Sequence, residues 1–211
     1  MYQPPHFRED RLAVQHALIR AQSLGLLITA GPGGLQANHL PFLIDAGGAE
    51  RGTLRAHLAR ANPQWHELAA VDECLVVFQG PQHYISPSLY PTKHEHGKGR
   101  ADVELHNRAC MGPTEGHRRC SLAQVDDLTL HKERSRPAPW LVSDAPEPFV
   151  AAQMKSIVGL EIPIARIEGK WKVSQNRPAT DQAGVVAGLR GGSDDAEIMA
   201  SLVAERIKNR P

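Results

Sequence analysis

The chain has 211 residues, of which 41% are apolar and 22% charged, so it is expected to fold as a globular protein rather than remain disordered. Its 24 Lys and Arg against 23 Asp and Glu leave a formal charge of +1, which excludes a broadly basic nucleic-acid clamp but not a local basic patch. Three cysteines without a CxxC spacing argue against a disulfide scaffold, and no apolar run approaches the roughly 20 residues of a membrane helix or forms a signal peptide, so we expect a cytoplasmic protein with no membrane partner.

The N-terminal part alternates short apolar runs with turn residues, which is typical of short strands joined by tight turns. The GPGG turn over 31–34 predicts a hairpin, and Asn62-Pro63 is a helix start, with Asn as the cap and Pro at the first helical position. We expect a helix over 10–23 capped by Asp10, strands over 24–30, 35–44, 53–58 and 73–79, and a helix over 63–71.

The C-terminal part predicts mostly helices. Asp144 followed by Glu147 is a capping-box pattern that opens a helix to about Val158. We expect further helices over 121–133, 180–189 and 194–208, and two strands or one bent strand over 159–173. The elements together indicate a small β-barrel with helices, an α+β fold, with the barrel core in residues 1–140 and an extension in residues 141–211 that completes the same domain.

The block His57-Leu-Ala-Arg60-Ala-Asn62-Pro63 places the end of a strand directly before the start of a helix. The free N–H groups of a helix start, together with Arg60 and His57, would suit an anion or a phosphate. The alternative is a capped surface helix with a solvated Arg.

Two further polar groups interrupt apolar sequence. Asn38-His39 lies inside a predicted strand, where the pair contacts a ligand or, alternatively, Asn38 faces solvent while His39 bonds to the backbone. The segment Gln175-Asn176-Arg177 follows a strand and would either read a ring edge or a phosphate, or cap the next helix.

Motifs for other chemistries are missing from the sequence. His94-Glu95-His96 has no third ligand at a recognised spacing, so we expect no metal site. The chain contains no GxGxxG, no Walker loop, no GxSxG and no HExxH, and we therefore name no catalytic residue.

Several longer motifs closely resemble the PaiB family, described as FMN-binding negative transcriptional regulators. The resemblance covers about residues 1–98 and 122–190. It rests on Met1-Tyr-x-Pro-x-His6-Phe7, Asn38-His-Leu-Pro-Phe42, His57-Leu-Ala-Arg-Ala-Asn-Pro-Gln-Trp65, Val77-Phe-Gln-Gly-Pro81, Tyr84-Ile-Ser-Pro87, Tyr90-Pro-Thr-Lys93 and Gly169-Lys-Trp-Lys-x-Ser-Gln-Asn-Arg-Pro178.

The resemblance implies a split β-barrel of the kind found in pyridoxamine-phosphate-oxidase-like flavoproteins, a homodimer, and FMN held at the subunit interface. It also implies a transcriptional role, with DNA as a partner. An FMN-dependent oxidoreductase acting on a small molecule, or a haem- or metabolite-binding relative of the same barrel, are the alternatives.

By the same resemblance, His57, Arg60 and Asn62 become candidates for the FMN phosphate, and Asn38 and His39 for the ring and ribityl chain. The remaining cofactor candidates contact FMN or complete the site of a dimer partner; they are Lys93, Gln175, Asn176 and Arg177.

Between about Gly99 and Cys120 the resemblance ends. The family continues after the Lys93 motif with V-P-T-W-N-Y and then V-H-x-x-G, whereas this chain has GRADVELHNRACMGPTEGHRRC. With a choice of codons, reading Gly99–Pro113 from the second base gives V-V-P-T-W-N-Y-T-T-V-H-V-W-G, and Met111, which has a single codon, yields Trp without any choice. We interpret the segment as translated in a shifted frame, with a compensating shift near Cys120; the alternative is a divergent insertion. A chain that carries this segment is expected to bind FMN poorly or to dimerise weakly.

Overall fold

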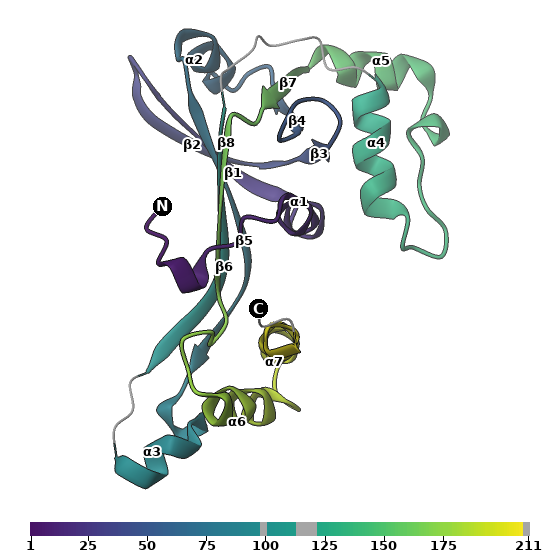
Figure 1. The fold of residues 1–211 in the computed structure, drawn as a ribbon. Helices are drawn as coiled ribbons and strands as arrows, with labels where there is room; N and C mark the ends of the chain where they lie inside the picture. The colour runs from purple at the N-terminus through teal and green to yellow at the C-terminus, as the bar shows by residue number, and fades with distance from the viewer. Residues whose placement is uncertain (98–100, 113–121, 209–211) are drawn as a thin grey trace. The chain divides into compact units, whose positions relative to one another are not determined.

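A computed structural model describes residues 1–97, 101–112 and 122–208, and of residues 105–112 it describes the backbone only. Within these limits the chain forms two compact units: unit 1 contains residues 1–10, 79–108 and 168–211, and unit 2 contains residues 11–78 and 109–167. Strands β5 (Cys74–Ile85), β6 (Asp102–Gly112) and β8 (Arg166–Lys172) each contain residues of both units. Figure 1 labels the helices and strands. The division of the sequence at residue 140 stays a prediction.

Unit 2 contains two sets of antiparallel strands. The predicted hairpin is formed by β1 and β2, and β5 pairs with β1 on its other side. In the second set, β4 lies between β3 and β7. The strands are β1 (Leu24–Gly31), β2 (Gly34–Pro41), β3 (Leu43–Asp45), β4 (Thr53–Ala59), β7 (Ile157–Pro163) and the first part of β5 (Cys74–Ile85). The helices are α1 (Leu12–Ala21), α2 (Gln64–Ala70), α4 (Leu122–Glu133), η3 (Val142–Asp144) and α5 (Glu147–Lys155).

The core of unit 2 is formed by alternate residues of these strands. On β4, Leu54, Ala56 and Leu58 point into the core, so the residues between them occupy the opposite face. The rings of Phe42 and Phe78 meet edge to face at 5.6 Å beside Gly25, where a Cβ atom would lie only 2.7 Å from the Phe78 ring. A side chain at position 25 would therefore displace this aromatic pair.

Unit 1 is built around its own apolar cluster. Helices α6 and α7 pack together through Val185 and Leu189 of α6 and Met199 and Val203 of α7, and the cluster includes Tyr90. The elements of this unit are η1 (Pro5–Phe7), the second part of β5, η2 (Pro87–Leu89), α3 (Pro91–His96), β6 (Asp102–Gly112), β8 (Arg166–Lys172), α6 (Ala179–Leu189) and α7 (Asp194–Lys208). The three strands adjoin in the order β5-β6-β8.

Three local expectations are corrected by the structure. Asp10 does not cap α1, because its carboxylate accepts from Arg8 Nε at 2.8 Å and the helix begins after Arg11 without a side-chain cap. Asp144 does not cap α5, because its carboxylate accepts from the backbone N–H of Leu141 and closes η3 instead. The strand expected over 35–44 is broken, since Pro41 has no N–H to donate to a ladder and β2 ends there.

The segment that departs from the family is in part a strand. Ala101, Val103 and Leu105 alternate with charged residues, a pattern typical of a strand, and the structure has a strand there, β6, which continues to Gly112. Residues 99–100 and 113–120 of the segment lie outside the described residues.

Candidate functional site

The outward face of β4 carries two basic side chains, Arg55 and His57. Each has a buried nitrogen without a hydrogen-bond partner, Nε of Arg55 and Nδ1 of His57. Burial lowers the pKa of His57, so its imidazole is neutral near pH 7. A buried Arg55 N–H without an acceptor is costly, and an anion placed between the two side chains would accept from it and from His57 Nδ1 in the tautomer that carries the proton there.

The surroundings of this face are mixed in charge. Arg55 Nη2 forms an ion pair with Asp127 of α4 at 2.9 Å, and Glu161 of β7 lies opposite Arg55 in the strand pair. Helix α4 is held against β4 by Gln124, whose amide donates to the Ala56 carbonyl at 2.5 Å. The guanidinium of Arg55 therefore faces a carboxylate at one end and has a free N–H at the other.

Arg60 and Asn62, both candidates from the sequence, are engaged with the backbone. The Arg60 guanidinium donates to the carbonyls of Lys155 at 2.8 Å and Ile157 at 3.0 Å, so it joins the end of β4 to the connection between α5 and β7. The Asn62 side chain accepts from the backbone N–H of Gln64 at 3.0 Å and so caps the start of α2. Both residues therefore fix the loop that follows β4.

Asn38 and His39 point to opposite faces of β2, and Asn38 is the one turned inward. Its amide donates to the carbonyl oxygen of the fully buried Gln64 side chain at 2.9 Å, whereas His39 is exposed. The Gln64 amide in turn lies 3.3 Å from the Thr29 hydroxyl and from the Gln36 carbonyl. Gln64 is thus the centre of a buried polar network that connects α2 to the β1–β2 hairpin.

Unit 1 brings together the Tyr90-Pro-Thr-Lys93 motif and the segment that contains Arg177. The Arg177 guanidinium lies 4.6 Å from the centre of the Tyr90 ring, a cation–π distance. Thr92 donates through its N–H at 3.1 Å and its hydroxyl at 2.8 Å to the buried carboxylate of Asp181, which fixes the first turn of α3. Lys93 follows directly on this anchored turn.

Gln175 and Asn176 differ in their hydrogen bonds and in their exposure. The Gln175 side chain accepts from the Val173 N–H at 2.6 Å and donates to the Trp171 carbonyl at 2.5 Å, so it shapes its own loop. Asn176 is exposed. The predicted residues thus form two groups, Asn38, His39, His57, Arg60 and Asn62 in unit 2, and Lys93, Gln175, Asn176 and Arg177 in unit 1.

Sequence reasoning missed Arg55 and Gln64. Arg55 lies two positions before His57, and the alternation of a strand would have placed both on one face. Gln64 is a polar residue directly after the Asn62-Pro63 helix start, but nothing local shows that it turns toward the sheet.

The described ranges 1–97, 101–112 and 122–208 contain no group of three or more His, Cys, Asp or Glu side chains that could hold a metal ion. None of their helices is both long enough and apolar enough to cross a membrane.

Comparison with known proteins gives one family and several relatives. The sequence model of the family described as "Putative FMN-binding domain" matches residues 1–166. An uncharacterized protein of Emericella nidulans, AN0679, is 33% identical over 98% of this chain and 97% of its own length. The Bacillus subtilis "Protease synthase and sporulation protein PAI 2" is 29% identical over the whole of both chains.

Solved structures resemble this chain in fold. The Mycobacterium tuberculosis conserved hypothetical protein Rv2991 aligns with a TM-score of 0.57 at 12% sequence identity, covering 84% of this chain and 94% of that protein. The fold expected from the sequence, a split barrel with added C-terminal helices, is confirmed.

Proposed function

We propose that this chain, which belongs to the PaiB-like family described as "Putative FMN-binding domain", binds FMN with the phosphate on the outward face of β4. The observation that carries the proposal is the pair of buried nitrogens without acceptors, Arg55 Nε and His57 Nδ1, on adjacent outward positions of one strand. Side chains two apart on a strand are separated by about 7 Å along it, a gap that a phosphate and its oxygens can bridge.

The residues of unit 2 fit the phosphate group chemically. Arg55 supplies a permanent positive charge, and His57 supplies an N–H from its neutral ring in one tautomer or a charge once protonated. Arg60, anchored to the Lys155 and Ile157 carbonyls, acts as a positioning residue that fixes the end of the strand. Bound FMN would supply hydride or electron transfer at its ring, for which the protein provides binding and orientation.

Within this proposal the protein is a homodimer that represses transcription in an FMN-dependent way. Family membership supports the proposal, while the formal charge of +1 requires that any DNA contact use a local basic patch. The test is selection of genomic DNA fragments by the purified protein at about 0.15 M salt, with and without FMN. Enrichment of a defined sequence supports repression, and retention of no sequence above background contradicts it.

The FMN site is tested by titration of protein expressed from the resequenced gene, followed by the quenching of flavin fluorescence. Arg55→Ala should weaken FMN binding by about 10- to 150-fold, the value of one charged hydrogen bond of about 1.5–3 kcal/mol. Asp127→Asn is the matched control, because it breaks the same ion pair but keeps the Arg55 donors. It should leave the affinity unchanged or raise it. An equal loss of FMN affinity in Arg55→Ala and Asp127→Asn would show that only the ion pair between these residues matters. It would contradict the proposal that Arg55 binds the FMN phosphate.

The role of His57 is tested by pH. A phosphate dianion beside the ring favours the charged imidazole, whereas burial favours the neutral one, so FMN binding should take up a proton. FMN affinity should therefore rise as the pH falls from about 8 to about 6.5, which lies above the phosphate pKa of about 6. His57→Gln keeps a donor and should remove the slope. If FMN affinity still rises with falling pH in the His57→Gln variant, a group other than His57 takes up the proton.

A further inference from the structure

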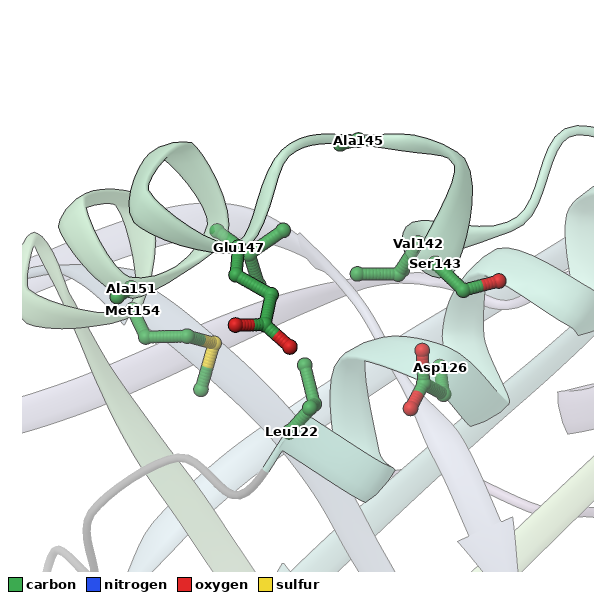
Figure 2. Close-up of a pocket in the computed structure, with 9 residues that line it drawn as sticks. Leu122, Asp126, Val142, Ser143, Ala145, Glu147, Ala151 and Met154 are labelled. Atoms are coloured by element: carbon green, nitrogen blue, oxygen red, sulfur yellow. The ribbon is translucent and has the colours of Figure 1, made fainter.

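Unit 2 contains a surface cavity of about 450 Å³ between α4 and the segment formed by η3 and α5. Its apolar lining includes Leu122 of α4, Val142 of η3 and Met154 of α5. Two carboxylates, Asp126 of α4 and Glu147 of α5, line the same cavity. Figure 2 shows the Glu147 and Met154 side chains pointing from α5 toward Leu122, with Asp126 on the same helix as Leu122.

We propose that this cavity binds a small organic cation, an amine that carries an apolar body. Its volume falls in the range of small-molecule sites, which are mostly apolar with a few polar groups that fix orientation. The apolar side chains would contact the body of the ligand and the two carboxylates its ammonium group. None of the nine lining residues is a candidate for FMN, so the proposal is independent of the flavin site.

The charge of the cavity selects the ligand class. In the described part of the chain, neither Asp126 nor Glu147 takes part in a hydrogen bond or an ion pair. The start of α5 favours the charge of Glu147, but Asp126 lies in the second turn of α4, beyond the reach of that helix end. Two unpaired carboxylates on facing elements repel an anion, add nothing for a neutral ligand and attract a cation.

The cavity is connected to the rest of unit 2 through the end of α5. Met154 directly precedes Lys155, whose carbonyl accepts from the Arg60 guanidinium at 2.8 Å, so the end of α5 that carries Met154 is anchored. Val142 is buried, with 7% of its surface exposed. The buried Val142 and the anchored end of α5 thus hold part of the apolar lining in place before a ligand arrives, which lowers the cost of binding.

The test uses the full chain with ¹³C-methyl methionine, because Met154 is one of only four methionines and its methyl group lines the cavity. Met154→Leu assigns its NMR signal. The probes are 2-phenylethylamine, 2-phenylethanol and 3-phenylpropanoate, which share the phenyl ring and differ in charge. We expect the amine to shift the Met154 signal and to bind about 5- to 10-fold more tightly than the alcohol, and the carboxylate not to bind.

Charge removal provides the second arm. Glu147→Gln and Asp126→Asn should each weaken amine binding by several-fold and leave binding of the alcohol unchanged, while Asp72→Asn, an exposed control in the same unit, should change neither. The proposal is overturned if the amine and the alcohol bind with equal affinity. It is also overturned if neither Glu147→Gln nor Asp126→Asn weakens amine binding. A Met154 signal that shifts with protein concentration alone would show instead that a second copy of the chain fills the cavity.

Discussion

Replacing Glu104 by Gln should make the folded protein more stable at pH 8. Glu104 lies on β6 in unit 1 with only 2% of its surface exposed, and one carboxylate oxygen accepts from the Ser174 hydroxyl. The other oxygen, Oε2, is buried and has no hydrogen-bond partner. Burial raises the pKa of this carboxyl from 4.5 to about 7, so at pH 8 the fold holds a buried negative charge.

The sign and size of the effect follow from linkage. The folded pKa lies above the unfolded one, so the stability of the fold is fully present below pH 4.5 and falls as the pH rises to about 7. The raised pKa corresponds to about 3 kcal/mol at pH 8, which is an upper limit because Gln also buries an amide that needs partners. Glu104→Gln should therefore gain up to about 3 kcal/mol at pH 8 and close to nothing at pH 4.5.

The assay is urea unfolding followed by circular dichroism at both pH values, with Glu95→Gln as the control. Glu95 is an exposed glutamate of the same unit, and its replacement should change the free energy of unfolding little at either pH. A Glu104→Gln gain that is the same at pH 4.5 and pH 8 would show that the difference does not arise from ionisation. A loss of stability at pH 8 would refute the view that the buried charge is uncompensated.

Three other outcomes follow from the structure. Cys74 is buried and burial raises its pKa to about 12, so iodoacetamide should leave it unlabelled in the native chain and label it in urea; rapid native labelling would contradict its burial. Asp181→Ala should lower the free energy of unfolding by about 1–3 kcal/mol, because Thr92 loses both hydrogen bonds, and an unchanged urea midpoint would refute this anchor. If residues 99–120 result from a frame error, digestion of the protein from its native source with trypsin should not yield the peptide over 101–108, and its detection by mass spectrometry would favour a divergent insertion.

The elements that sequence predicts well are those determined by local chemistry. The GPGG turn yields the β1–β2 hairpin, and the helix expected over 194–208 is α7 with the same bounds. The two predicted caps fail for a common reason. Asp10 and Asp144 are good capping residues, but each has a nearer donor, Arg8 in one case and the Leu141 N–H in the other.

The candidate site is less predictable because distant residues decide which polar groups are free. Arg60 looks available in the sequence, yet its donors are taken by carbonyls 95 and 97 positions later in the chain. Arg55 looks like an ordinary strand residue, yet its Nε is left without an acceptor. Strand alternation shows which face these side chains share, whereas their hydrogen bonds depend on the packing of α4, α5 and β7 against β4.

The segment that departs from the family places two carboxylates on β6. Glu104 and Asp102 both belong to it, and β6 accommodates Asp102 through an ion pair with Lys172 but leaves one oxygen of Glu104 without a partner. In the shifted frame, the codon of Glu104 overlaps those of Trp and Asn, which are both uncharged. A frame error would place a carboxylate at a buried position without regard to its surroundings, and Glu104 is a buried carboxylate with one unpartnered oxygen. The peptide over 101–108 therefore tests the origin of the segment through the sequence itself, whereas the gain expected from Glu104→Gln at pH 8 tests the cost of the buried carboxylate, whatever its origin.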